Sequence, residues 1–242
     1  MILPNVRASF SANEIDILVR VLERETRRSR RALERQMIEE GLDSLLDHPG
    51  TFSAIMDRGG LSAIPSRLVF YVMVRRTLLD SGLENPIVAD YIAALLIEFA
   101  MGQRAYRIAP YDDATYHYLV DLIADLEEET SERRKFLLQV HLGNFSLWLS
   151  GLFPDHVVAR VHRRGAPGFA YYEDLGATGY RLASTCELAG QFDLARVYIE
   201  VADGFRAVRR ALNRVSDHYF FRRPPSPVDR LLGEVADGLR EG

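Results

Sequence analysis

Two groups of side chains in this 242-residue sequence have the types and spacing that binding chemistry needs. In the first group, Arg163 and Arg164 stand directly before the turn 165–168, and Tyr171 and Tyr172 follow it. Guanidinium groups, a turn and aromatic rings could together hold an anion at the start of a helix, stack on nucleic-acid bases or anchor a protein partner. A simpler reading also fits, in which the arginines end one helix and the tyrosines enter the core.

His141 is the second candidate. The helix predicted around it places its ring beside Leu137, Phe145 and Trp148, where burial would lower the imidazole pKa and keep the group neutral. A neutral imidazole can act as a base, but no serine, cysteine or acid lies at a matching spacing. We therefore name no catalytic residue, and ordinary core packing stays open as the alternative for His141.

Metal and cofactor chemistry is not indicated. None of the six histidines has a carboxylate three residues before it, so the Glu-x-x-His pattern of helical di-iron sites is missing, and so are phosphate loops and nucleophile elbows. Asp121, Asp125 and Glu128 share one helical face, opposite the apolar one, which predicts an exposed acidic stripe. We expect no metal site and no cofactor.

The composition is that of a folded globular protein, with 48% hydrophobic and 26% charged residues. The net charge of -4 gives no general attraction to phosphate, which makes nucleic-acid binding a second alternative resting on arginine-rich helices such as 24–35 and 206–214. Cys186 is the single cysteine, and we find neither an export signal nor a membrane span. These features indicate a cytoplasmic protein, and the preference for arginine over lysine is associated with GC-rich bacterial genomes.

Hydrophobic periodicity predicts an all-α fold, either a multi-helix bundle or an irregular helical array of about 8–10 helices. Ser11 and Glu14 have capping-box spacing and begin a helix predicted to run to Glu40. Asn85 and Pro86 begin another, and Asp112 or Asp113 a third. The apolar run 68–74 fits either a strand or a helix, and we prefer the helix because no partner strand is visible. Two long helices are expected over 169–188 and 192–219.

The helix predicted over 131–153 is apolar on nearly all sides and should be central. Its remaining strip carries Gly143, Ser146 and Ser150, small residues that would let another helix approach closely. Pro154 should end this helix or redirect the chain.

We predict a single helical domain over residues 1–223. A subdivision is possible near 47–65, where paired glycines and prolines favour loop with at most one short helix. Residues 224–242 read as a proline-linked C-terminal helix that could dock on a partner chain.

Residues 179–202 resemble a single tetratricopeptide hairpin. The matching positions are Leu182, Ala183, Gly190, Phe192, Ala195, Tyr198 and Ala202, whereas Gly179 and Cys186 stand where the family favours tryptophan and tyrosine. The resemblance implies binding to other proteins as a function, and an ordinary antiparallel helix pair is the alternative.

The leading hypothesis is therefore a protein that acts by protein–protein interaction or homo-oligomeric assembly, rather than an enzyme. The alternative is a small-molecule (anion) binding protein or enzyme with a pocket between helices near His141 and Arg163–Tyr172.

Overall fold

The computed structural model describes residues 1–56 and 64–217, with backbone only for Arg163 and Arg164. These residues contain thirteen α-helices, two short 3-10 helices and no strand, which confirms the all-α prediction. The α-helices are α1 (Ala12–Thr26), α2 (Arg30–Glu40), α3 (Asp43–Leu46), α4 (Pro49–Met56), α5 (Ser66–Leu79), α6 (Pro86–Phe99), α7 (Leu119–Glu128), α8 (Glu132–Leu152), α9 (Pro154–Arg164), α10 (Phe169–Ser184), α11 (Glu187–Gln191), α12 (Ala195–Asp203) and α13 (Phe205–Val215); the 3-10 helices are η1 (Arg7–Ser9) and η3 (Gly102–Tyr106).

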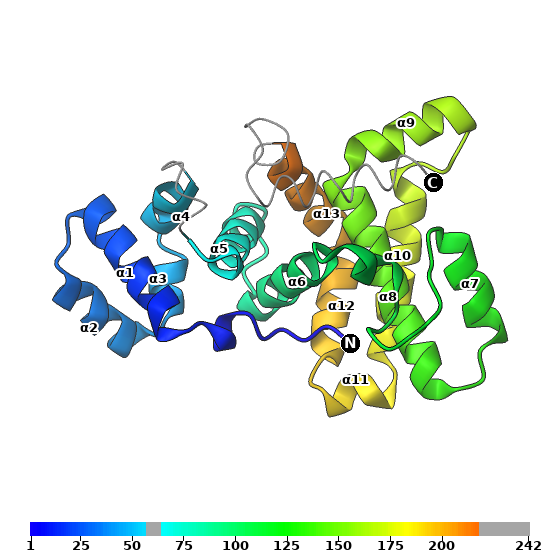
Figure 1. Cartoon of the computed structure of the whole chain (residues 1–242), viewed down its shortest axis with the longest axis horizontal. Coiled ribbons are helices and arrows are strands. Elements are labelled where there is room, and N and C mark those ends of the chain that lie inside the picture. Colours follow the sequence, from blue (N-terminus) through cyan, green and yellow to red (C-terminus); the bar gives the residue numbers. More distant parts are fainter. Residues whose placement is uncertain (57–63, 218–242) are drawn as a thin grey trace.

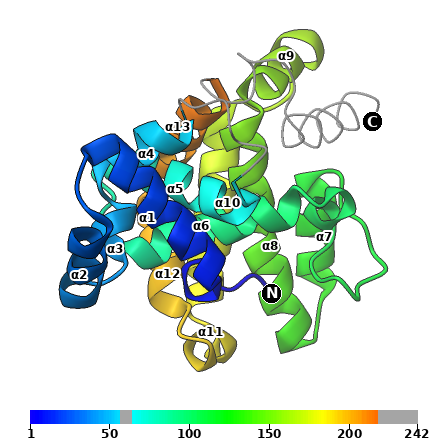
Figure 2. The same cartoon turned by 60° about the vertical axis from the view of Figure 1, so that its left-hand side comes forward.

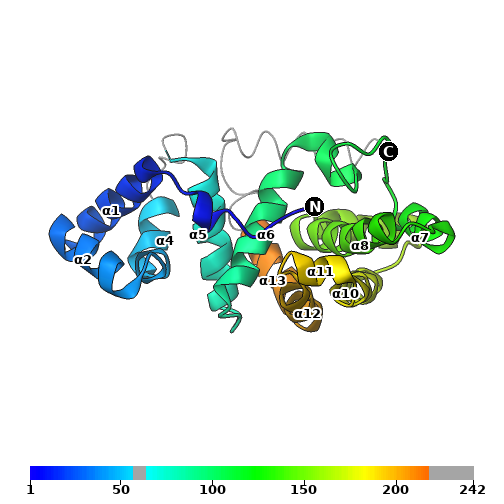
Figure 3. The same ribbon diagram turned by 90° about the horizontal axis from the view of Figure 1, so that it is seen from below.

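The helices form an elongated array (Figure 1). Helices α1–α4 pack together at one end, and the view in Figure 2 brings them forward. Helices α5 and α6 lie side by side in the middle, and α8, α10, α12 and α13 make up the other half, with α7 beyond them (Figure 3). One apolar core runs through the array, so the N-terminal helices and the α8 region are joined by continuous packing.

Helix α8 is central, as its composition predicts: every residue from 136 to 152 is buried. Helix α10 crosses it very closely. A methyl group added at Gly179 would lie 2.7 Å from the carbonyl oxygen of Gln139, and one added at Gly143 would lie 2.8 Å from the ring of Tyr180. The small strip on α8 therefore does admit a second helix at close range.

Several local predictions are confirmed. The side chain of Ser11 accepts a hydrogen bond from the Glu14 backbone, and the Glu14 carboxylate accepts one from the Ser11 backbone N–H, completing the capping box. Asn85 caps α6 with Pro86 in its first turn. The apolar run 68–74 is part of helix α5, and α4 is the one short helix described within the loop-rich segment 47–65.

The single helix expected from Ser11 to Glu40 is wrong. The chain breaks at Arg27, whose backbone is left-handed at φ 55°, and Ser29 caps a new helix by accepting a hydrogen bond from Ala32 N. The break folds α2 back, which buries Leu33 completely. A continuous exposed helix would have left that side chain without a core.

The helix start at Asp112 or Asp113 is also wrong, since α7 begins at Leu119. The carboxylate of Asp112 does cap a turn, but it does so inside a loop, where it accepts a hydrogen bond from Ala114 N at 2.9 Å and pairs with Arg134. Because the Asp112 carboxylate makes these contacts within the loop, it does not cap helix α7.

The two long helices expected near 169–188 and 192–219 are each divided. Helix α10 ends at Ser184, the short α11 follows, and α12 and α13 meet at Gly204. These breaks, the one at Arg27 and the short helix α3 raise the number of helices above the expected eight to ten. The predicted C-terminal helix in 224–242 lies outside the described residues, as do residues 57–63 of the possible hinge.

Candidate functional site

The candidate site lies on one face of α8. His141, Phe145 and Trp148 follow one another at intervals of four and three residues, so they line up along the same side of the helix. The Phe145 ring stacks on His141 at a centroid distance of 6.0 Å and on Trp148 at 5.7 Å. All three side chains are buried.

Other elements complete this cluster. Phe99, the last residue of α6, lies 5.8 Å from the His141 ring and 5.7 Å from that of Trp148. Tyr116 lies 6.4 Å from His141. Tyr106, at the end of η3, lies 6.1 Å from Phe145 and 6.3 Å from Trp148. We call this set the His141 site, and it consists of Phe99, Tyr106, Tyr116, His141, Phe145 and Trp148.

Two ring nitrogens in the His141 site are buried without a hydrogen-bond partner. They are Nε2 of His141 and Nε1 of Trp148. Leaving a buried polar atom unpaired costs about 1–3 kcal/mol, so most such atoms in proteins are paired. Two such atoms lie in one aromatic cluster, the His141 site.

The imidazole of His141 is held neutral. Burial, together with the positive charge of Arg104, lowers its pKa from 6.5 to about 3. The Arg104 guanidinium lies 5.8 Å from the centre of the Phe99 ring, and its Nε donates to Glu98 at 3.0 Å. At neutral pH His141 therefore offers one N–H and one acceptor nitrogen, beside a fixed cation.

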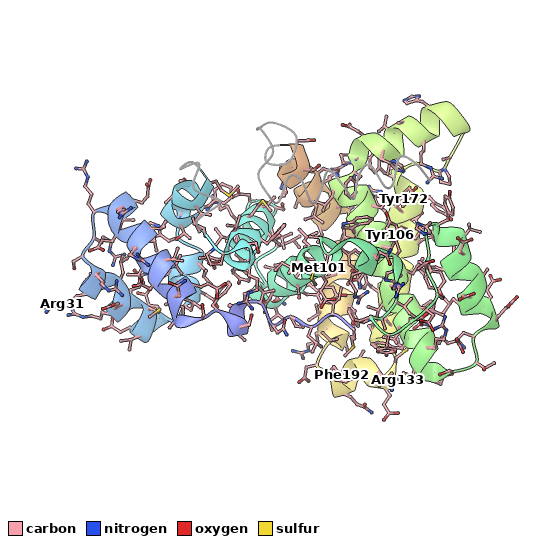
Figure 4. The ribbon with its side chains drawn as sticks, viewed as in Figure 1. Arg31, Met101, Tyr106, Arg133, Tyr172 and Phe192 are labelled. Carbon is pink, nitrogen blue, oxygen red and sulfur yellow. The ribbon has the colours of Figure 1, made fainter. Side chains whose placement is uncertain are left out.

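The cluster reaches the surface at Tyr106. This side chain is half-buried, and its ring lies 4.5 Å from that of the exposed His117. Figure 4 shows Tyr106 where the chain leaves η3 beside α8. Tyr106 and His117 form the outer edge of the site, whereas His141 and Trp148 are buried.

A compact loop contributes two rings to the site. Residues 106–116, which we call loop 106–116, begin and end close together because Tyr116 N donates to Tyr106 O at 2.8 Å. Loops of this kind, with joined ends and their own packed side chains, are frequently functional. The ring at each end of the loop, Tyr106 and Tyr116, belongs to the His141 site.

The structure does not bring all the predicted site residues together. Tyr171 and Tyr172 stand in the first turn of α10 with their rings 5.7 Å apart, and Tyr172 is buried. They belong to the α10 side of α8, the side that Gly143 presents to Tyr180. His141 precedes Gly143 by two residues, which is about 200° around the helix, so it faces the opposite way.

Only the backbone of the two predicted arginines is described. Arg163 and Arg164 end α9, before the left-handed Gly165 at φ 60°. Arg160 of the same helix places its guanidinium 5.4 Å from the centre of the Tyr118 ring.

Sequence reasoning missed the residues that come from outside α8. Phe99 is the last residue of α6, and Tyr116 lies in the loop before α7, where a helix starting at Asp112 or Asp113 was expected. The available signal was the length of the segment between α6 and α7, because a long connection within a compact domain is often a binding loop.

The acidic stripe is exposed in part. Asp121 and Glu128 are exposed, but Asp125 is half-buried and its carboxylate accepts a hydrogen bond from the Tyr116 hydroxyl at 2.5 Å. Within residues 1–56 and 64–217, no group of three or more histidine, cysteine or acidic side chains is placed to hold a metal ion.

Comparison with known proteins gives no match: no family model fits the sequence, and neither a curated protein nor a solved structure resembles the chain at a significant level. Over the part of the chain that the structure describes, no single helix has the length and apolar character to cross a membrane, although α8 and α9 together, bent by 88°, meet that test.

Proposed function

We propose that this protein binds a small aromatic molecule with a hydrogen-bond-accepting group at the His141 site. The observation that carries the proposal is the pair of buried, unpartnered ring nitrogens of His141 and Trp148 within one aromatic cluster. We infer that the bound molecule supplies the missing hydrogen bonds, which offsets the cost of burying these atoms.

The chemistry of the site favours an aromatic carboxylate. The indole N–H of Trp148 can only donate, so its partner must accept. His141 can donate from Nε2 in one of its two neutral tautomers, and the nearby Arg104 favours negative charge. The surrounding rings favour a flat ligand, because offset or edge-on aromatic contacts add to the burial of apolar area.

The test uses Trp148, which is the only tryptophan in the chain, so its emission reports directly on the site. Benzoate is titrated into the protein with excitation at the indole, and cyclohexanecarboxylate serves as the non-aromatic comparison. We expect a saturable change with benzoate and a weaker one with cyclohexanecarboxylate. A response that does not saturate, or none, would overturn the proposal.

Matched variants locate the binding. His141→Phe keeps a ring of similar size but removes Nε2, and losing one hydrogen bond should weaken benzoate binding about tenfold. His162→Phe makes the same change on exposed α9 and should leave the binding unchanged. Equal affinities for the two variants would place any binding elsewhere. Native mass spectrometry of freshly purified protein would show whether a compound is already retained.

A second candidate function is binding of a protein partner or a second copy of the chain. The observation that favours it is the exposure of three large apolar side chains in the α10–α12 region, Leu182 at 44%, Phe192 at 48% and Ile199 at 46%. Exposed apolar side chains gathered in one region are typical of interaction surfaces. The same region carries the resemblance to a tetratricopeptide hairpin, whose family acts in this way. A cytoplasmic location, which the single Cys186 favours, is part of this proposal.

Oligomeric state tests this second candidate. If Leu182, Phe192 and Ile199 bind a second copy, native mass spectrometry should show a discrete oligomer that dissociates when the three are replaced by glutamine. Val120→Gln, on α7, removes a similarly exposed apolar side chain and should leave the oligomer intact. A wild-type monomer, or an oligomer that survives the triple change, would count against self-association through this region.

A further inference from the structure

Arg134 connects loop 106–116 to α8. Its Nη2 donates to the Tyr116 hydroxyl at 2.8 Å, and its Nη1 pairs with Asp112. The same guanidinium lies 2.9 Å from Glu129 and 3.5 Å from Asp125. We call these five residues the Arg134 network. It joins the loop to the end of α7 and the first turn of α8.

Tyr116 belongs to both the Arg134 network and the His141 site. Its hydroxyl accepts from Arg134 and donates to Asp125 at 2.5 Å, while its ring lies 6.4 Å from that of His141. Burial and the hydrogen bond to Asp125 raise the pKa of Tyr116, so the hydroxyl keeps its proton and remains a donor. A substitution at Arg134 is therefore expected to affect the His141 site through the side chain of Tyr116.

Both ends of loop 106–116 place a ring against the buried site. Tyr106 lies beside Phe145 and Trp148, which are completely buried, and Tyr116 lies beside His141. Because Trp148 is completely buried, a molecule of the size of benzoate can reach it only if a covering side chain moves, and loop 106–116 supplies one of these, Tyr106. The Arg134 side chain is 33% exposed, so water and salt can weaken its ion pairs, and the network is suited to opening.

We propose that Arg134 is a positioning residue that holds loop 106–116 closed through Tyr116 and so controls access to the His141 site. The role in ligand entry rests on the proposed binding function. The closing of the loop does not depend on a ligand, and it can be tested without one.

The test is collisional quenching of Trp148 by acrylamide. Removing a partly exposed ion-pair network should raise the open population about fivefold, so the quenching constant should rise clearly in Arg134→Gln. Tyr116→Phe keeps the ring in the site but deletes the hydroxyl, and it should raise quenching in the same direction. High salt should raise the quenching constant of the wild-type protein toward the values of the variants.

Arg181→Gln is the matched control, because Arg181 makes an exposed ion pair with Asp203 at 3.2 Å on helices remote from the loop. It should quench like the wild type. Urea unfolding of each variant shows that quenching is compared between folded proteins. Equal quenching of wild type, Arg134→Gln and Tyr116→Phe would overturn the proposal.

The two proposals fail separately. If the variants raise quenching but benzoate does not bind, the Arg134 role stands and the binding function is wrong. If benzoate binds to the wild type and the variants change neither quenching nor the association rate, the binding function stands and the Arg134 role is wrong.

Discussion

The imidazole of His141 and the indole of Trp148 stack on the same ring, that of Phe145, at 6.0 and 5.7 Å. The two polar rings lie two turns apart on α8, and each keeps one buried nitrogen without a partner. The apolar surroundings that hold these rings also remove water from their nitrogens. The same apolar surroundings thus stabilise α8 and leave these two nitrogens without a hydrogen-bond partner.

The depressed pKa of His141 predicts a pH-dependent stability. The folded protein keeps His141 neutral down to about pH 3, whereas the unfolded chain protonates it near pH 6.5. The unfolded state binds more protons between these values, so the stability contributed by neutral His141 is lost as pH falls through this window, by about 1.4 kcal/mol per pH unit.

Urea unfolding at pH 7.5 and pH 5 would measure this effect. The unfolding free energy of the wild type should fall relative to that of His141→Phe at the lower pH. If the difference in unfolding free energy between the wild type and His141→Phe were the same at both pH values, the pKa of His141 would not be lowered in the folded protein.

The contact between α8 and α10 predicts a strong effect of one methyl group. In Gly179→Ala the added carbon would lie 2.7 Å from Gln139 O and 3.0 Å from Gly143 N, both backbone atoms that cannot move alone. We expect a loss of about 1–3 kcal/mol of unfolding free energy. Gly190→Ala has nothing within 4 Å and should be nearly neutral in the same denaturation experiment. Equal stability of both variants would show that the helices are further apart.

Glu173 pairs with two arginines of very different exposure. Arg209 donates to it at 2.7 Å with its side chain 9% exposed, and Arg206 at 2.8 Å with 67% exposed. Arg209 also stacks on Phe169 at 4.5 Å. Arg209→Gln should cost about 3 kcal/mol in a denaturation experiment because it breaks a buried pair, and Arg206→Gln less than about 1 kcal/mol. A larger loss of unfolding free energy for Arg206→Gln than for Arg209→Gln would contradict the prediction that the buried pair contributes more.

Asn144 accepts hydrogen bonds from two buried tyrosines. The hydroxyls of Tyr91 and Tyr180 lie 2.6 and 2.7 Å from its Oδ1. Asn144→Leu should cost about 2–4 kcal/mol, because both donors lose their partner in the core. Adding Tyr91→Phe and Tyr180→Phe to this variant should recover part of the loss, as thermal denaturation would show. If stability is not recovered, the cost of Asn144→Leu would come from altered core packing rather than from the lost hydrogen bonds.

About half of the site could be predicted. The spacing of His141, Phe145 and Trp148 on one helix identifies a buried, neutral imidazole, because helical periodicity is a local property. Phe99, Tyr106, Tyr116 and Arg134 could not be assigned, since their contacts join segments far apart in the chain. Tyr172, expected near His141, lies on the other side of α8 for the same reason.

The sequence by itself determined the all-α class, the central place of α8, the cap at Ser11 and the close approach at Gly143. These follow from composition, helical period and side-chain size, which act within a few residues. Tertiary structure decided where the helices break and what covers His141. Arg27 turns the chain so that Leu33 reaches the core, and Asp112 leaves its expected helix to pair with Arg134. Burial and ion pairing between distant segments outweigh the small local preference for continuing or starting a helix.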